Sequence, residues 1–417
     1  MNTESSLADQ PVLTQMNLRP IVSMATLARL PNSEITELIS RMFAGPIDDN
    51  LFMSQFQLFS VLGNRDFALE MQAKALEMNR VYRIEGPQSP IIRLLALMAE
   101  GDPTDNTPLD YLVEHSDIQL DLLYIVPGRP LPTEIPEHDV AIIAPGASTR
   151  SRETLEIMDN LVARWPRPVL NLPRPILYCS RDRCYLNLKS IPGLAIPPTL
   201  RASRQDLENA AAGVSVVEPL LGDRGVAYPI TLRPLDSQSG KGLARIENTA
   251  ELADYLDTTD AEDFFVSRYI DYRSADGHYR KARIALIDGQ PFICHLAIGD
   301  HWIVHYNSAG MMDSAAKRDE EQRFMQRFDS DFALRHGKAL HAIAERLQLD
   351  YVVLDCAETI AGELLLFEAD NRGWVHSTDP VDIFLYKQPP MNRLFGAFRN
   401  MLLNAMTGPA NSNLRQD

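Results

Sequence analysis

The sequence predicts an open parallel α/β sheet followed by an α+β region, with a small helical region ahead of both. Short apolar runs alternate with helical stretches between residues 88 and 171, which is typical of a parallel sheet. Strand-like runs dominate from Tyr228 onward. Apolar residues recur at helical spacing between Asn32 and about Asn79, which indicates helices there.

The helical region is expected to span residues 1–85, with residues 1 to about 30 polar and loosely held. Two helices are predicted on either side of the turn at Asn64. Such a hairpin resembles one tetratricopeptide-like unit, but arrays of these units need about three repeats for stability. A helical cap packed on the next domain is therefore the preferred interpretation.

Residues 86–172 are expected to form the α/β domain. Buried strands are predicted at 91–98, 122–126, 140–144 and 168–171, and helices at 109–115 and 153–165. Two of these strands end in Pro-Gly, which places loops at the carboxyl edge of the sheet, where such sheets bind ligands. No GxGxxG motif is present, so a dinucleotide-binding fold is not supported.

Residues 173–405 are expected to form the α+β part. The proline-rich stretch 173–198 is interpreted as a crossing between domains. The predicted strands that follow lie at 229–233, 242–246, 264–270, 280–287, 290–298, 351–355 and 363–368. Helices are predicted at 249–256, about 331–347 and 392–406.

The composition excludes several classes of function. The formal net charge of the 417-residue chain is −16, so long-range attraction to nucleic acid or anionic lipid is not expected. Four cysteines without a CxxC pair do not suggest a disulfide framework. The sequence has no signal-peptide pattern and no apolar run long enough for a membrane span. A cytoplasmic protein is expected.

The strongest chemical signal is a pair of acids near the C-terminus. Asp355 ends one apolar strand and Glu368 ends the next, with a hairpin turn at Ala361-Gly-Glu between them. Antiparallel strands joined in this way place the two carboxylates side by side, which suits Mg²⁺ with its preference for oxygen ligands. Asp370 or Asn371 is expected to supply a third oxygen. Surface acids flanking a hairpin are the alternative.

A second signal is the segment that follows Arg233. It contains Ser237, Ser239, Gly240, Lys241 and Gly242, and small residues let backbone N–H groups approach phosphate oxygens. The segment does not match GxxxxGK[ST], so a Walker-type loop is disfavoured. A mobile hairpin tip without a ligand is the competing interpretation.

Taken in order, these motifs resemble the ATP-grasp superfamily, which includes D-alanine–D-alanine ligase and glutathione synthetase. The resemblance covers about 171–398 and implies an ATP-grasp domain at 173–405, with a small lobe at about 200–265 and a large lobe at about 266–405. Residues 86–172 then correspond to the domain that precedes the grasp fold in this superfamily. The cofactors implied are ATP and Mg²⁺.

The resemblance also assigns roles to individual residues. Arg183 and Arg233 are expected to hold the α and β phosphates of ATP. Arg283 is the expected catalytic residue, stabilising the γ-phosphoryl group and then the oxyanion, with Arg280 and Lys281 near it. The hinge strand 264–270 is expected to contact the nucleotide through Arg268, Tyr269 and Ile270.

Three departures from the family pattern stand out. Arginine occupies both phosphate-contacting positions that are usually lysine, which preserves the charge and adds a planar fork. The family's Glu-x-Asn becomes Glu368-Ala-Asp370-Asn371, so position favours Asp370 and residue type favours Asn371. The hinge has Ser267-Arg268 where an acid or Gln is common, which leaves Asp271 or Asp276 for the ribose.

A cluster rich in histidine follows the predicted strand at 290–298. His295, Trp302, His305 and Ser308 lie within fourteen residues, and we expect them to recognise the acceptor substrate. His301 and His305 are spaced for a metal on a helix, but the β-branched residues between them disfavour a helix. A structural loop around a packed tryptophan is the alternative. His376 and Lys387 are further candidates for the substrate side.

The function implied by the resemblance is an ATP-dependent carboxylate–amine ligase. It would act on an amino acid or peptide through an acyl phosphate, releasing ADP and phosphate. The alternatives are a phosphotransferase, a ligase with a thiol or hydroxyl acceptor, and a non-catalytic nucleotide-binding regulator whose helices form a partner surface. No nucleic-acid or membrane partner is expected, and a homodimer is the commonest assembly.

Overall fold

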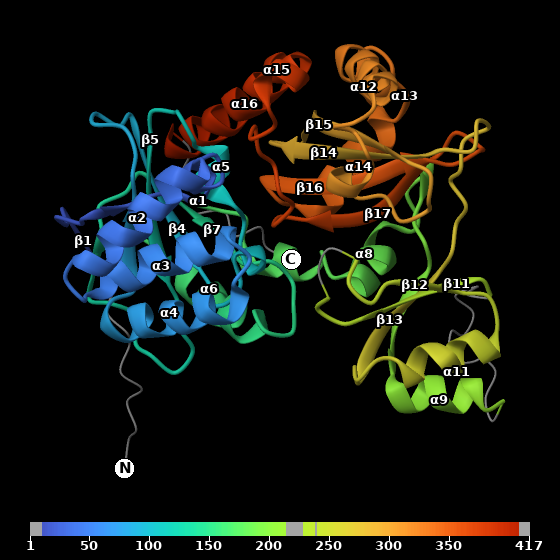
Figure 1. The fold of residues 1–417 in the computed structure, drawn as a ribbon, viewed down its shortest axis with the longest axis horizontal. Helices are drawn as coiled ribbons and strands as arrows, with labels where there is room; N and C mark the ends of the chain where they lie inside the picture. Colours follow the sequence, from blue (N-terminus) through green and yellow to red (C-terminus); the bar gives the residue numbers. More distant parts are fainter. Residues whose placement is uncertain (1–10, 214–227, 238–239, 408–417) are drawn as a thin grey trace.

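The computed structural model describes residues 11–213, 228–237 and 240–407 of the chain. Within these ranges it contains three sheets of four or more strands, together with a short ladder between β1 (Val12–Thr14) and β6 (Glu134–Pro136). One sheet lies in the N-terminal half, and two lie in the C-terminal half (Figure 1). The predicted fold class, an α/β part followed by an α+β part, is confirmed.

The N-terminal sheet has six strands in the order β2-β3-β5-β4-β7-β8. All neighbouring pairs are parallel except β3 and β5. The strands are β2 Pro20–Ile21, β3 Val81–Ile84, β4 Ile92–Met98, β5 Ile118–Tyr124, β7 Val140–Ile143 and β8 Val169–Leu170. The central strands read as continuous apolar runs because both faces are covered.

Helices from the first 85 residues cover one face of this sheet. The covering helices are α3 Asp49–Val61 and α4 Arg65–Met78, with α1 Met24–Leu27 packed against α3, whereas α2 Asn32–Ala44 is mostly exposed and lies outside this layer. Met53, Phe56 and Met71 share one core with Leu94 of the sheet, so α3 and α4 pack on this sheet. The expectation of a loose N-terminal stretch is wrong for residues 11–30, because β2 pairs with β3 and Ala25 and Leu27 are fully buried.

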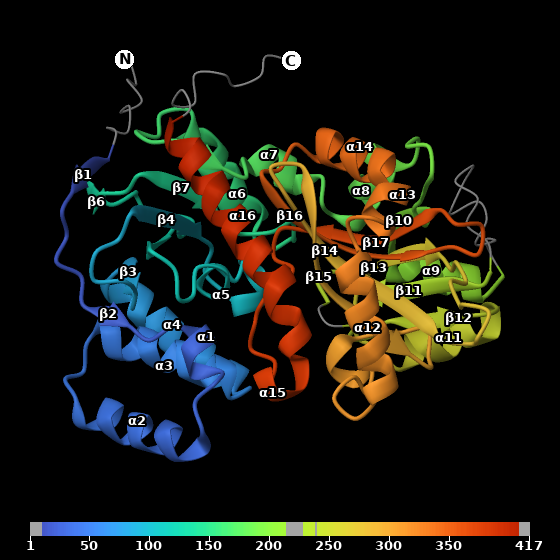
Figure 2. The same cartoon turned by 90° about the horizontal axis from the view of Figure 1, so that it is seen from above.

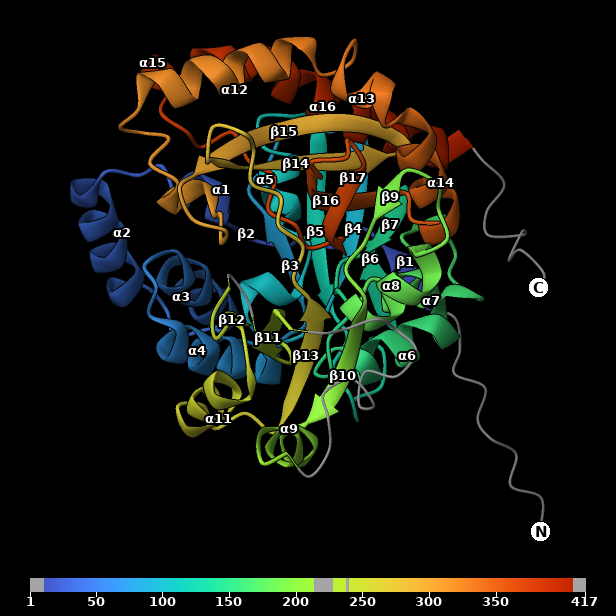
Figure 3. The ribbon, with the colours of Figure 1, turned by 90° about the vertical axis from the view of Figure 1, so that its right-hand side faces the viewer.

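The second sheet is antiparallel, with the order β10-β13-β11-β12. Two helices cover it, as seen at the lower end of Figure 3. The strands are β10 Thr199–Ser203, β11 Ile230–Pro234, β12 Ala244–Ile246 and β13 Asp263–Arg268, and the helices are α9 Arg204–Ala211 and α11 Thr249–Asp257. We call it the small sheet.

The third sheet, which we call the large sheet, has the order β15-β14-β16-β17-β9. Its strands are β9 Leu194–Ala195, β14 Tyr279–Ile287, β15 Gln290–Gly299, β16 Tyr351–Glu358 and β17 Leu364–Asp370. The helices around it are α12 Ala315–Arg327, α13 Phe332–Arg335, α14 Gly337–Leu347, α15 Val381–Phe384 and α16 Gln388–Thr407. The short 3₁₀ helices η3 Tyr306–Ser308 and η4 Leu385–Lys387 lie in its loops.

The proline-rich stretch 173–198 is partly helical, which differs from the predicted plain crossing. It contains α7 Pro173–Leu177 and α8 Arg181–Leu188. Proline is tolerated in the first turn of a helix, where its missing N–H has no intrahelical partner in any case. The prolines of α7 occupy this first turn.

The helix α16 joins the N-terminal sheet to the large sheet. Figure 2 shows it crossing the molecule between the two halves. Leu394 and Phe398 are fully buried in a core that includes Ile142 of β7 and Val353 of β16. No helix among the described residues is long and apolar enough to cross a membrane.

Two buried asparagines connect the same two sheets through hydrogen bonds. Asn171, with a positive φ of 53°, accepts from the Tyr351 N–H at 2.9 Å and donates to the Tyr351 carbonyl at 2.8 Å. Asn371 donates to the carbonyls of Ala144 at 3.2 Å and Pro145 at 3.0 Å. Each side chain thus bonds to buried backbone groups that belong to the other sheet or to the loop after one of its strands.

We predict that Asn171→Ala destabilises the protein by about 3 kcal/mol. It leaves two backbone groups of Tyr351 unpaired and puts a Cβ-bearing residue without a polar side chain at positive φ. Urea unfolding measures the change. The matched control is Asn160→Ala, whose exposed side chain bonds only within its own helix and which should cost at most about 0.5 kcal/mol. Equal costs for the two variants would contradict the predicted role.

Candidate functional site

A cavity of about 750 Å³ lies between the small sheet and the large sheet. Its walls include Thr231 and Phe265 of the small sheet, and Arg283 and Asp355 of the large sheet. This volume is typical of pockets for small molecules and cofactors. We call this cavity the cleft.

A row of four polar residues crosses the large sheet on the face that lines the cleft. The strand registers pair Glu368 with Asp355, Asp355 with Arg283, and Arg283 with His295. Directly opposed residues on neighbouring strands have Cβ atoms about 4.5–5.5 Å apart. The hairpin therefore places Asp355 beside Glu368 as predicted. We call these residues the cross-strand row.

Irregular pairing marks both outer steps of this row. The register shifts after Arg283 in its pairing with β15, and after Asp355 in its pairing with β17. Each shift leaves one residue unpaired, Cys294 on β15 and Phe367 on β17. Such bulges change the direction in which neighbouring side chains point, and they are common beside active sites.

Asp355 is buried and is held by two cations. Arg283 donates to its two carboxylate oxygens at 2.8 and 3.0 Å, and Lys281 donates at 3.1 Å. A third donor of Arg283 reaches the Trp374 carbonyl at 2.9 Å. Burial raises the pKa of the Asp355 carboxyl, but Arg283 and Lys281 outweigh this and hold that pKa well below its usual range.

Glu368 pairs with Arg181, at 2.7 Å. Burial raises the pKa of Glu368, and the charges of Arg181 and Arg233 more than offset this and lower it. The positive charge of Arg233 is disfavoured, because burial, followed by the charge of Arg181, lowers the pKa of its guanidinium to about 10. Two arginines that disfavour each other's charge form a site at which an anion is stabilised.

Arg181, and not the predicted Arg183, lines the cleft. Arg181 is the first residue of α8, and two residues along an α-helix correspond to a rotation of about 200°. Arg183 therefore leaves the helix on another side. The sequence signal that could have identified Arg181 is its position at the start of a helix, which the surrounding prolines obscured.

The glycine-containing segment after Arg233 lies over the cleft. Ser237 accepts a hydrogen bond from Arg233 at 3.1 Å. A Cβ on Gly240, which has a φ of 71°, would lie 2.6 Å from His305 Nε2, so only glycine fits there. The Gly242 carbonyl accepts from Tyr255 at 2.6 Å. Lys241 is exposed, and Ser239 lies outside the described residues.

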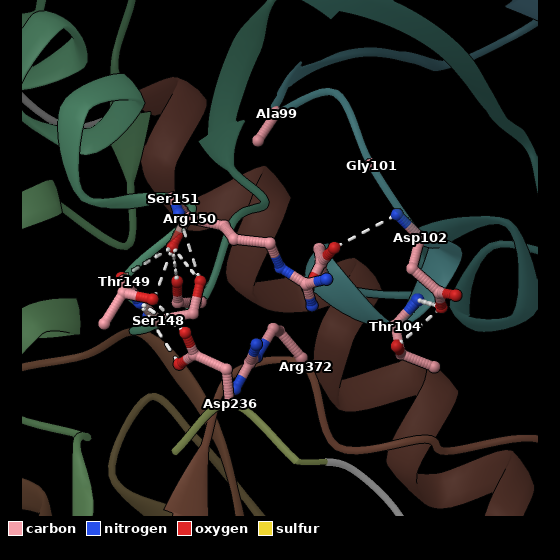
Figure 4. Close-up of polar contacts among 12 residues, drawn as sticks. Ala99, Gly101, Asp102, Thr104, Ser148, Thr149, Arg150, Ser151, Asp236 and Arg372 are labelled. Atoms are coloured by element: carbon pink, nitrogen blue, oxygen red, sulfur yellow. Dashed lines mark hydrogen bonds and ion pairs between the residues drawn. The ribbon is translucent and has the colours of Figure 1, made fainter. Parts of the chain in front are cut away.

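The segment after Arg233 also contacts the loop that follows β7 of the N-terminal sheet, as Figure 4 shows. The Thr149 N–H donates to both carboxylate oxygens of Asp236 at 3.1 Å. Arg150, the next residue, donates to Asp105 at 2.9 Å. A Cβ on Gly146 would lie 2.1 Å from Arg372 Nε, so glycine is required where that arginine passes. The loop 146–151 thus contacts both the segment after Arg233 and Arg372, which lines the cleft.

The hinge residues Arg268, Tyr269 and Ile270 all line the cleft. The Arg245 guanidinium lies over the Tyr269 ring at 4.1 Å, and Trp302 packs edge-on against the ring. The two ribose candidates do not line the cleft. Asp271 pairs with Arg273, and Asp276 pairs with Arg280.

The two candidates for a third metal ligand differ in position. Asp370 lines the cleft and pairs with Arg372 at 2.7 Å. Asn371 is fully buried, does not line the cleft, and uses its amide to hold Ala144 and Pro145. No group of three or more His, Cys, Asp or Glu side chains among the described residues is arranged to hold a metal ion.

The remaining predicted residues come from β15 and the loop after it, and from the segment after β17. His295, Trp302, His305, Ser308 and His376 all line the cleft. The sequence did not indicate the network behind them. There, buried Glu321 accepts from the hydroxyls of Tyr306 at 2.8 Å and Tyr386 at 2.6 Å. Lys387 pairs with Asp379 at 2.6 Å and lies over the Tyr306 ring.

No protein-family model matches the chain, and no curated protein matches it. Its fold is similar to that of the VanG D-Ala:D-Ser ligase from Enterococcus faecalis, with 11% identity, a TM-score of 0.47, and coverage of 76% of this chain and 99% of that chain. It is similar to a D-alanine–D-alanine ligase from Bacillus anthracis complexed with ATP, at 13% identity, a TM-score of 0.44, and coverage of 76% and 96%.

A third similar structure is the RimK domain protein ATP-grasp from Sphaerobacter thermophilus, with 14% identity, a TM-score of 0.41, and coverage of 74% of this chain and 99% of that chain. The names of these proteins include a D-alanine–D-alanine ligase and an ATP-grasp protein. Identities and scores at this level do not transfer an activity, so function has to be argued from the residues of the cleft.

We predict that the cleft binds inorganic tripolyphosphate through Arg181. Arg181→Ala should weaken the binding about 10- to 100-fold, since it removes a charge-assisted hydrogen bond worth about 1.5–3 kcal/mol. Arg183→Ala is the matched control on the same helix, and it should bind like the wild type. Isothermal titration calorimetry measures both. A loss for Arg183→Ala as large as that for Arg181→Ala would contradict this assignment.

Proposed function

We propose that the protein is an ATP-grasp-type ligase that uses Mg²⁺ and ATP to join a carboxylate to an amine. The observation that carries the proposal is the cross-strand row, in which two adjacent acids, the partly exposed Glu368 and the buried Asp355, are followed by Arg283. This arrangement combines oxygen ligands for a metal with a cation for a transferred phosphoryl group.

The charge of the cleft supports a polyanionic ligand. Seven basic side chains line it, against four carboxylates, although the whole chain carries a formal charge of −16. The basic residues are Arg181, Arg233, Arg268, Lys281, Arg283, Arg372 and Lys387. A positive cavity in an acidic protein focuses the field on a small anion and does not attract long polyanions. A nucleoside triphosphate with a bound divalent cation fits this pattern.

Apolar side chains beside the hinge would contact the base of a nucleotide. Ile196, Phe265, Ile270 and Leu366 line that part of the cleft together with Tyr269. They come from both sheets, so a planar ring between them would be enclosed from both sides. Pockets of this kind bind mainly through apolar contact and use a few polar groups for orientation.

The acids of the row fit a magnesium ion by their chemistry. Asp355 and Glu368 are adjacent, and both have lowered pKa values, so both are anionic at neutral pH. Asp370 is placed to assist, and Asn371 is engaged elsewhere. When bound, Mg²⁺ would neutralise phosphate charge and orient the terminal phosphates. The arginines that now neutralise these acids would then be released toward the phosphates.

The residues of the chain supply positioning and charge for two steps. In the first, a substrate carboxylate oxygen attacks the γ-phosphorus of ATP, and ADP leaves. Arg181 and Arg233 hold the phosphates, and Arg283 stabilises the transferred group. In the second, an amine attacks the acyl carbon and phosphate leaves, while Arg283 stabilises the oxyanion. Gly240, which lines the cleft beside His305, would help to exclude water that would hydrolyse the acyl phosphate.

We predict that the wild-type protein releases ADP from Mg²⁺ and ATP when supplied with pooled amino acids and short peptides. Glu368→Gln should lower this rate at least about 100-fold, because it removes a charge from the metal-holding pair. The matched control is Glu363→Gln, an exposed residue at the turn of the same hairpin, which should retain the wild-type rate.

Two outcomes would contradict the proposal. If the wild type does not bind ATP, the cleft is not a nucleotide site. If it binds ATP but forms no ADP with any pool, a non-catalytic nucleotide-binding regulator is favoured. Dependence of ADP release on an amine separates the ligase from a phosphotransferase and from ligases with a thiol or hydroxyl acceptor.

A further inference from the structure

His295 ends the cross-strand row on the side away from the metal-holding acids. Its position on β15 lies opposite Arg283, and Arg283 lies between it and Asp355. The order along the row is therefore acid, acid, arginine, histidine. If the proposed function is correct, ATP approaches from the side of the acids, and the acceptor approaches Arg283 from the side of His295.

A bulge aims this histidine into the cleft. Cys294 is the unpaired residue of β15 at the register shift, and both Cys294 and His295 line the cleft. In a regular strand, two successive side chains point to opposite faces of the sheet. His295 pairs directly with Arg283 beside this bulge, so the two side chains lie on the same face of the sheet.

The ring of His295 is held in place from behind. It packs against the ring of Tyr306 with centroids 4.5 Å apart. The Tyr306 hydroxyl is fixed by Glu321, which also accepts from the N–H of Leu296 at 3.1 Å. No hydrogen bond to a ring nitrogen of His295 occurs within the described residues, so these nitrogens are available to a substrate.

The surroundings keep this histidine neutral. Burial, followed by the charges of neighbouring cations, lowers the pKa of His295 well below its ordinary value. The charged and titratable groups around it are Arg283 and Lys281 from β14, Lys387 from η4, Asp355 from β16, Tyr306 from η3 and Glu321 from α12. Cations predominate among these groups, so the imidazole is unprotonated at neutral pH and has a free lone pair. Anionic phosphates bound beside Arg283 would offset these cations and raise its affinity for a proton, as a base requires.

Once the amine nitrogen bonds to the acyl carbon it becomes strongly acidic, and a base beside it takes its proton before the amine can leave again. We propose that His295 is a catalytic base that takes the proton from the attacking amine. This inference rests on the proposed ligase function. A ring nitrogen of His295 accepts the proton, the amine nitrogen forms a bond to the acyl carbon, and the C–O bond to phosphate breaks with its electron pair leaving on phosphate.

Hydroxylamine separates this role from acyl phosphate formation, because it is largely unprotonated at neutral pH and attacks acyl phosphates without a base. We expect His295→Ala to lower amine-dependent ADP release, assayed with the amino acid and peptide pools, by about 100-fold or more. Hydroxamate formation from the same pools with hydroxylamine should stay near the wild-type rate. Added imidazole should restore part of the amine-dependent rate.

Two further variants separate the loss of a base from a general loss of folding or activity. His341→Ala changes an exposed histidine on α14 and should leave both rates unchanged. His295→Gln retains side-chain volume and polarity without a basic nitrogen, so it should lose the amine-dependent rate alone even if His295→Ala folds poorly.

Loss of both rates in folded His295→Gln, or of neither, would overturn the role of His295 as base. Absence of any hydroxamate in the wild type would instead overturn the proposed ligase function, and with it the base.

Discussion

The buried ion pair between Arg283 and Asp355 is the interaction on which the rest of the cleft depends. Removing two charges from water is costly, and only good geometry with further hydrogen bonds compensates for it. Here the pair is bidentate, Lys281 adds a third donor, and the Trp374 carbonyl accepts from Arg283. These contacts fix the centre of the cross-strand row. They also place the Asp355 carboxylate beside two cations. Under the proposed function, the carboxylate would bind a metal ion and the cations would bind phosphate.

The position of this pair is set by the way in which the N-terminal sheet and the large sheet are joined. Asn171 satisfies the backbone of Tyr351, four residues before Asp355 on β16, and Asn371 anchors the end of β17 against Ala144 and Pro145. The helix α16 fills the core between these sheets. The hydrogen bond from the Thr149 N–H to Asp236 also holds the segment after β11 close to the loop that follows β7. The cleft thus lies between the small and large sheets, and the N-terminal sheet supports it from outside.

Much of this arrangement could be predicted from the sequence because it is local. The apolar strands before Asp355 and Glu368 and the short turn between them determine a hairpin, so the pairing of the two acids followed from spacing alone. The helix α12 was not predicted because it is largely polar and buries little besides Glu321 and Met325. Arg181 was missed because the prolines around it hid α8. The use of Asn371 as a connection between sheets depends on residues more than 200 positions away, which no local pattern encodes.

The central claim is that the cleft transfers a phosphoryl group from ATP to a carboxylate oxygen. The most direct measurement uses pooled amino acids labelled with ¹⁸O in their carboxylates, with the released phosphate analysed by mass spectrometry. Passage through an acyl phosphate predicts that each phosphate carries one ¹⁸O atom from the acid. Phosphate released without label would show that water, and not a carboxylate, accepts the phosphoryl group, and would contradict the account.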